Sequence, residues 1–208
     1  QYRLFYGSSG TATGVSEGLI GTLRITPEGG TRFEWSETKG IQASAGITSG
    51  FNSSGVEKFY HGDYAGYVYN HDTGNDFNPA GTATSINAEY ETPSMDFGDL
   101  GTIKTLKYIK LSVKPEGSVQ PSLRVGYDYD DENVAQPSNY TLDTIPSAAI
   151  FGSGVFNSVT FGASENPMVR KTIEGTGTTA YFRLFSDDTN GPYTINGIYI
   201  DYVASGRI

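Results

Sequence analysis

The stretch Ser122-Leu123-Arg124-Val125-Gly126-Tyr127-Asp128-Tyr129 decides the fold class of this chain. Its odd-numbered positions are apolar, whereas the residues between them are polar or glycine. This period of two is typical of a β-strand with one buried face. We therefore predict a half-buried strand from Leu123 to Tyr129, with Tyr127 in the core and Arg124 on the opposite face.

The segment before it, Thr102 to Val113, fits two structures. Its apolar residues at Ile103, Leu106 and Ile109 are spaced as on a helix, but half of the segment consists of Thr, Ile, Tyr or Val, which favour strands. We therefore predict a strand, with a bulge near Tyr108 because the apolar phase shifts there. Residues 114–118, Lys-Pro-Glu-Gly-Ser, suggest a hairpin connection into the next strand.

The end of the chain suggests a second hairpin. Alternation over 180–185 and again over 193–203 predicts two strands, with Ser186 to Pro192 as the turn between them. Both strands are partly apolar on both faces, as expected between two packed layers. Shorter strands are predicted at 85–91, 156–161 and 169–174. About seven strands in residues 82–208 indicate an antiparallel β-sandwich domain.

Residues 1–81 indicate a different kind of β region. Three short strands are predicted at 41–48, 56–61 and 66–70, and the ending Gly62-Asp63-Tyr64-Ala65-Gly66-Tyr67-Val68-Tyr69 is typical of the outer strands of a β-propeller blade. Eighty residues hold fewer than two blades, so we expect an incomplete propeller and a chain that is a fragment or a processed product. The best linker is Asp72 to Thr82, which separates domains 1–81 and 82–208.

Composition agrees with this all-β class and excludes several functions. The chain has 208 residues, of which only 18% are charged, with 27 Gly, 15 Tyr and 11 Phe. The net charge of −9 argues against a surface that binds duplex DNA by neutralising phosphates. No cysteine is present, which excludes disulfides, thiol nucleophiles and thiolate metal sites. The longest apolar run, Ala148 to Phe151, is too short to span a membrane.

Two polar clusters were weighed as metal sites. The first contains both histidines, His61 and His71, with nearby carboxylates at Asp63, Asp72 and Asp76. A metal needs three or four converging ligands, and the spacing places the two histidines at opposite ends of a strand pair, so turn-flanking polar residues are the favoured interpretation.

The second cluster suggests a calcium loop. It contains Asp128, Asp130, Asp131, Glu132 and Asn133. The glycine and distal glutamate of an EF-hand are missing, so a solvated strand end is favoured. We predict no metal at either cluster.

No arrangement of residues predicts catalysis. Twenty-three acidic residues single out no glycosidase pair, and the Gly-x-Ser-x-Gly motif of many hydrolases is absent. The runs 152–154 and 175–177 are too short for a phosphate loop and are not followed by Gly-Lys-Ser or Gly-Lys-Thr. We expect a protein that is not an enzyme, with no catalytic residue and no cofactor. Trp35 and the many tyrosines would suit either a sugar-binding platform or a large β-interface, and composition does not separate these two.

A series of short motifs runs through residues 41–208. In order, they are Gly62-Asp63-Tyr64-Ala65-Gly66-Tyr67-Val68-Tyr69, Thr73-Gly74-Asn75-Asp76-Phe77, Glu91-Thr92-Pro93-Ser94-Met95-Asp96-Phe97-Gly98-Asp99, Lys104-Thr105-Leu106, Lys114-Pro115-Glu116-Gly117, Gln136-Pro137-Ser138-Asn139-Tyr140-Thr141-Leu142, Ser186-Asp187-Asp188-Thr189-Asn190 and Gly197-Ile198-Tyr199-Ile200-Asp201-Tyr202. With these motifs, residues 41–208 resemble the C-terminal part of the tail-tube, or nozzle, proteins of short-tailed bacteriophages. In that family a β-propeller is followed by a β-sandwich. The resemblance implies no catalytic residue.

The resemblance implies a structural protein of the virion, located in the phage tail. It implies a homo-oligomeric ring of six copies, docked on other tail proteins such as the adaptor and fibres, through which phage DNA passes without specific binding. No membrane span is expected. The alternative is a carbohydrate-binding β-sandwich module, such as a receptor-binding tail appendage.

Overall fold

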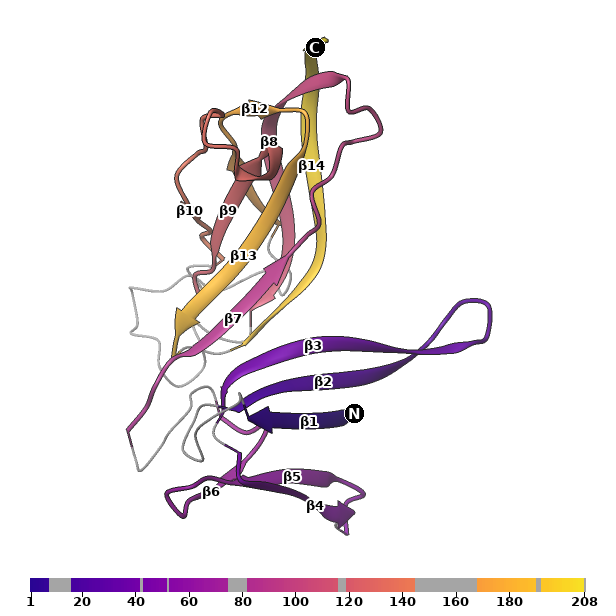
Figure 1. The fold of residues 1–208 in the computed structure, drawn as a ribbon, viewed down its shortest axis with the longest axis vertical. Coiled ribbons are helices and arrows are strands. Elements are labelled where there is room, and N and C mark those ends of the chain that lie inside the picture. Colours follow the sequence, from indigo (N-terminus) through magenta and orange to yellow (C-terminus); the bar gives the residue numbers. More distant parts are fainter. Residues whose placement is uncertain are drawn as a thin grey trace, which may run out of the picture. The chain divides into compact units, whose positions relative to one another are not determined.

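The computed structural model describes residues 1–7, 16–41, 43–51, 53–74, 82–115, 119–144, 168–189 and 192–207. Nearly all of the regular structure in these residues is β-strand, so the predicted all-β class is confirmed. The chain divides into two compact units, Gln1–Thr73 and Gly74–Ile208, which are labelled by their strands in Figure 1. The boundary falls eight residues before the one predicted at 81/82.

The first unit contains two three-stranded antiparallel sheets. One has the order β1-β2-β3 and the other β4-β5-β6. Their bounds are β1 Tyr2–Gly7, β2 Ser16–Ile25, β3 Thr31–Ile41, β4 Ala45–Phe51, β5 Glu57–Gly62 and β6 Val68–Asn70. The strand predicted at 41–48 begins instead at Ala45, because Ile41 ends the preceding strand β3.

A tight turn joins β5 to β6. In the β5–β6 turn the Asp63 carboxylate accepts hydrogen bonds from the backbone N–H groups of Ala65 and Tyr67, each at 2.8 Å. Gly66 in this turn has a φ of +91°, a conformation that favours glycine. The turn therefore pairs His61 with Tyr69 across the hairpin.

The first unit has almost no apolar interior. Among its described residues, those classed as buried are Gly18, Gly21 and His61. The two sheets meet where Phe5 of β1 stacks on Phe59 of β5, with ring centroids 6.1 Å apart. Burial of apolar surface is the main favourable term in folding, so this unit has little of its own to stabilise it.

The second unit contains two further sheets. One has the order β10-β9-β13-β7, and in the other β11 and β12 pair with successive parts of β8 while β14 pairs along its length. The bounds are β7 Ile86–Glu91, β8 Thr102–Pro115, β9 Ser122–Tyr127, β10 Tyr140–Thr141, β11 Met168–Thr172, β12 Thr176–Gly177, β13 Ala180–Asp188 and β14 Tyr193–Arg207. The strand predicted at 156–161 lies outside the described residues.

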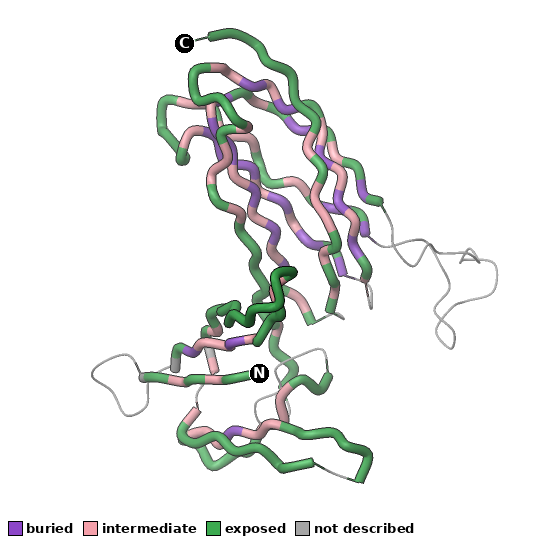
Figure 2. The backbone as a smooth tube through the Cα atoms, turned by 90° about the vertical axis from the view of Figure 1, so that its right-hand side faces the viewer, coloured by how far each residue is buried: buried purple, intermediate pink, exposed green. Residues whose placement is uncertain are grey.

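Side chains from both of these sheets form one hydrophobic core. Figure 2 shows buried and partly exposed positions alternating along its strands. The core includes Leu106, Ile109, Leu111 and Val113 of β8, Leu123, Val125 and Tyr127 of β9, and Phe182 and Leu184 of β13. The predicted burial of Tyr127 is therefore confirmed.

The predicted strand is too long at its end. Strand β9 ends at Tyr127 because Asp128, Tyr129 and Asp130 all have positive φ angles. Tyr129, predicted to share the buried face, is 73% exposed. The apolar alternation in the sequence extends to Tyr129, but the strand ends where the backbone turns.

The predicted bulge in β8 is confirmed. Tyr108 pairs with Asp201 of β14, but the next pair joins Leu106 to Tyr202, which leaves Lys107 without a partner in the register. The buried positions accordingly change from even to odd numbers across this point. One extra residue shifts every later side chain to the other face.

Both predicted hairpins of the second unit are wrong. Strands β8 and β9 belong to different sheets, and so do β13 and β14. The two strands of each predicted hairpin are therefore in facing sheets and are not adjacent strands of one sheet. The apolar faces of consecutive strands thus contribute to the same core from two sheets, and alternation alone does not distinguish a neighbour in the sheet from one in the facing sheet.

Candidate functional site

One face of the sheet β1-β2-β3 is covered with aromatic and aliphatic side chains. The register places Tyr2, Gly21 and Trp35 in one row across the sheet. The Trp35 ring lies over Gly21, where a Cβ atom would come within 2.8 Å of it. Tyr2 contacts Trp35 edge-on at a centroid distance of 6.3 Å, and Phe33 lies 5.6 Å from it on the same strand.

This face is open to solvent. We define the aromatic face as Tyr2, Leu4, Tyr6, Leu23, Ile25, Phe33 and Trp35. Each of these side chains is at least 43% exposed, and Trp35 is 52% exposed. Exposed apolar patches of this kind mark sites of interaction, because isolated soluble domains normally keep such a sheet face polar.

Three charged residues of the same hairpin lie on the opposite face. Arg24 and Arg32 both form ion pairs with Glu34, at 3.2 and 2.8 Å. The hydrogen bond from Arg32, ahead of that from Arg24, lowers the pKa of the Glu34 carboxyl. The register places two carboxylates, Glu17 beside Tyr6 and Glu37 beside Leu19, on the same side of the sheet as the aromatic face.

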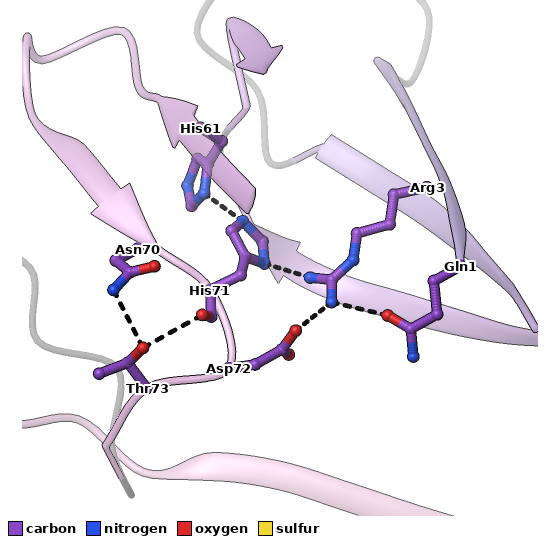
Figure 3. A network of polar contacts seen from close by, with 7 residues as sticks. All are labelled: Gln1, Arg3, His61, Asn70, His71, Asp72 and Thr73. Atoms are coloured by element: carbon purple, nitrogen blue, oxygen red, sulfur yellow. Dashed lines mark hydrogen bonds and ion pairs between the residues drawn. The ribbon is translucent and has the colours of Figure 1, made fainter. Parts of the chain in front are cut away.

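The two histidines meet at the junction of the two sheets of this unit, contrary to the prediction that they lie at opposite ends of a strand pair. Figure 3 shows the chain of contacts: His61 Nδ1 lies 2.5 Å from His71 Nε2, and His71 Nδ1 lies 2.7 Å from Arg3 Nη1. His61 is on β5, His71 directly follows β6, and Arg3 is on β1. The hairpin brings the histidines together, and tertiary packing adds Arg3.

Arg3 fixes the tautomers of both rings. A guanidinium can only donate hydrogen bonds, so Nδ1 of His71 must accept, and the proton of that neutral ring is on Nε2. His71 then donates to Nδ1 of His61, whose own proton is also on Nε2. His61 is 3% exposed, and its Nε2 is buried with no hydrogen-bond partner among the described residues.

This environment disfavours charged histidines. Burial, the neighbouring His61 and the Arg3 guanidinium lower the pKa of His71 to about 4, against a smaller opposing effect of Asp72. Burial also lowers the pKa of His61, with Asp63 opposing. Both rings are therefore neutral at pH 7.

The nearby carboxylates do not complete a metal site. Asp63 accepts hydrogen bonds within its turn and from the Tyr69 hydroxyl at 3.1 Å, and the exposed Asp72 carboxylate forms an ion pair with Arg3. Asp76 lies outside the described residues. In the part of the chain that the structure describes, no three His, Asp or Glu side chains form a group able to hold a metal ion.

The acidic run that suggested calcium is divided among separate contacts. The Asp128 carboxylate accepts hydrogen bonds from the N–H groups of Thr178 and Thr179, at 2.8 and 2.9 Å, and from the Thr178 hydroxyl at 2.6 Å. Burial opposes ionisation of Asp128, but these hydrogen bonds lower its pKa. Asp130 bonds instead to Arg124 and the Tyr181 hydroxyl. These carboxylates thus hold loops to strands.

A shallow hollow of about 310 Å³ lies in the second unit, and its lining includes Ile86, Tyr90, Ser186 and Tyr193. The described residues that line it include one serine and carboxylates but no histidine.

Comparisons with known proteins leave the chain without an assigned family. No family model matches it, and no curated protein matches it. Among the described residues, no helix is long and apolar enough to cross a membrane.

The sequence analysis identified the residues of the two polar clusters but not the hydrogen bonds that they form. The turn motif from Gly62 to Tyr67 was the available signal that His61 faces the strand containing Tyr69. No local signal connects Arg3 to His71, which is 68 residues away.

Proposed function

We propose that this protein is a non-enzymatic structural component of a bacteriophage tail, forming part of the tube or nozzle through which the genome is ejected. The observation that carries the proposal is the aromatic face. A thin sheet with rings on its open face and little buried apolar surface gains stability when a neighbouring subunit covers it. The resemblance over residues 41–208 supports the phage-tail assignment.

Charge supports the same role. The chain carries a net charge of −9. An acidic protein around a DNA channel repels phosphates, so the DNA slides instead of binding. We further propose a β-propeller-like first domain, a β-sandwich second domain and a six-fold ring docked on adaptor and fibre proteins. A closed ring buries the same surface on every copy.

Purified virions test this proposal. Mass spectrometry of the particles of a phage that encodes this chain is expected to detect it at a few copies per virion, and electron cryo-microscopy to place it in a symmetric ring of the tail. Particles that lack the chain, or a location outside the tail, would contradict the proposal.

The second candidate is a carbohydrate-binding module. It is favoured by the exposed cluster of Tyr2, Phe33 and Trp35, since aromatic rings stack on the apolar faces of sugars. Glycan binding with a sub-millimolar Kd that is lost in Trp35→Ala would support it over the structural role. Tyr199→Ala, which changes an exposed ring of the second unit, is the matched control.

A further inference from the structure

The contact between the two sheets of the first unit depends on a directional chain of hydrogen bonds. It runs from the Arg3 guanidinium to Nδ1 of His71, and from Nε2–H of His71 to Nδ1 of His61. Arg3 belongs to the sheet β1-β2-β3, whereas both histidines belong to the β4-β5-β6 side. The Arg3 side chain is only 8% exposed, and its guanidinium also lies 5.1 Å from the centre of the Phe59 ring.

This chain cannot accept a proton and stay intact. A proton on Nδ1 of His71 would point at an Arg3 N–H group, placing two donors and two positive charges together. A proton on Nδ1 of His61 would likewise point at the Nε2–H of His71. His71 can become charged only if its hydrogen bond to Arg3 across the junction breaks, and His61 only if its hydrogen bond to His71 breaks.

The surrounding groups give little compensation for such charges. From β1, Arg3 and Phe5 face the imidazoles, and from β5 and β6 the rings of Phe59 and Tyr69 do so. Of the two carboxylates nearby, Asp72 is already paired with Arg3. Asp63 is held by its own turn and by the Tyr69 hydroxyl.

We propose that the chain Arg3–His71–His61 is an acid-sensitive latch that holds the sheet β1-β2-β3 against the sheet β4-β5-β6 and releases it when the histidines take up protons. The inference does not depend on the proposed function. Release exposes Phe5 and Phe59, which are stacked at the junction, and separates the sheet that carries the aromatic face from the sheet β4-β5-β6.

The sign of the pH dependence follows from linkage. The pKa of each histidine is lower in the closed unit than in the open one, so the open unit binds more protons below about pH 6.5, and for His71 this holds down to about pH 4. Lowering the pH through this window therefore favours opening. Proton uptake by His71 raises the opening constant by up to about tenfold per pH unit, and uptake by His61 adds to this rise.

The tautomers give the first test, on the full wild-type chain. His61 and His71 are its only histidines, so labelling with ¹⁵N-histidine yields ring signals from these two alone. At pH 7.5, NMR is expected to show both rings neutral and protonated on Nε2. A ring protonated on Nδ1, or a ring already charged at pH 6, would overturn the latch.

The proton count gives the second test. Hydrogen exchange of β1 and β5 amides, corrected for the intrinsic exchange rate, measures the opening constant between pH 6 and pH 4.5. Wild type should show an increase of about tenfold or more per pH unit, His71→Gln a smaller increase, and the double variant with His61→Gln no such increase. Equal slopes in wild type and the double variant would overturn the proposal.

The amides of β9 and β13 serve as the internal control, because the second unit has no histidine and should show no such slope. Glutamine was chosen because its amide can accept from Arg3 and donate to His61. If the variants do not fold, the wild-type slope decides instead. A wild-type slope below tenfold per pH unit would then contradict the latch.

Discussion

Tyr127 connects the core of the second unit to its loops. It is 1% exposed, its hydroxyl donates a hydrogen bond to the Glu174 carbonyl at 3.0 Å, and its backbone N–H donates to the Gln136 side chain at 2.8 Å. Arg124, three residues earlier, has its side chain 38% exposed and forms a surface ion pair with Asp130. The two residues share a strand but not an environment.

Replacing these residues should therefore have unequal effects. Tyr127→Ser is expected to lower the free energy of unfolding of the second unit by about 3 to 5 kcal/mol, whereas Arg124→Ser should cost roughly 0.5 kcal/mol. Urea titration, with unfolding monitored by hydrogen exchange of the β9 and β13 amides, measures the loss of unfolding free energy in each variant. Equal losses would show that the register assigned to β9 is wrong.

The Tyr127 ring leaves no room for a side chain at Gly175. Its φ is +104°, and a Cβ atom there would lie 2.5 Å from the Tyr127 ring. Gly98 has a similar φ of +88° but nothing within 4 Å of the Cβ position. Gly98→Ala should thus cost only the left-handed backbone strain, about 1 to 2 kcal/mol, and Gly175→Ala a further ~1 to 3 kcal/mol from overpacking. Thermal unfolding of the two variants compares these costs, and similar Tm values would contradict the close contact.

At the scale of elements, Asp128 joins the end of β9 to the residues between β12 and β13. Its carboxylate bonds to Thr178 and Thr179 lower its pKa in the folded state, so its stabilising contribution is present above about pH 5 and is lost as the pH falls through that lowered pKa. The stability of the contact between the end of β9 and residues 178–179 should therefore decrease in acid.

Asp128→Asn is expected to destabilise the second unit by about 1 to 2 kcal/mol at pH 7, since the charge-assisted hydrogen bonds become neutral. The difference from wild type should shrink as the pH is lowered from 6 to 2. Urea titrations at several pH values measure it. Asp131→Asn, whose carboxylate bonds only to Asn133 among the described residues, is the control. If the difference in unfolding free energy between wild type and Asp128→Asn does not change with pH, the charge of Asp128 does not have the stabilising role proposed here.

At the scale of the whole molecule, the two units differ in how they are stabilised. The second has a core shared by two sheets, whereas the described residues of the first include no buried apolar side chain. Many of its rings lie instead on the aromatic face and at the junction of Phe5 with Phe59. We expect such a unit to be stabilised by polar contacts and by neighbouring chains.

The isolated chain is therefore expected to self-associate at tens of micromolar. The triple variant Leu23→Ser, Phe33→Ser, Trp35→Ser should reduce the mass measured by light scattering, because it removes most of the aromatic face on β2 and β3. Tyr199→Ser, at a 60% exposed position on β14, is the control and should leave the mass unchanged. A wild-type chain that is monomeric at this concentration would contradict the expectation.

The sequence by itself predicted several strands of the second unit and much of their burial, but it did not predict β1, β2 and β3 of the first unit. Alternation at Leu123, Val125 and Tyr127 and the phase shift near Tyr108 were enough, because side chains of a strand alternate by local geometry alone. Only the tertiary structure decided that β8 and β9 lie in different sheets and that Arg3 reaches His71. Those contacts form when segments far apart in the sequence pack against one another. A local sequence pattern shows which face of a strand is buried, but it does not show which distant segment packs on that face.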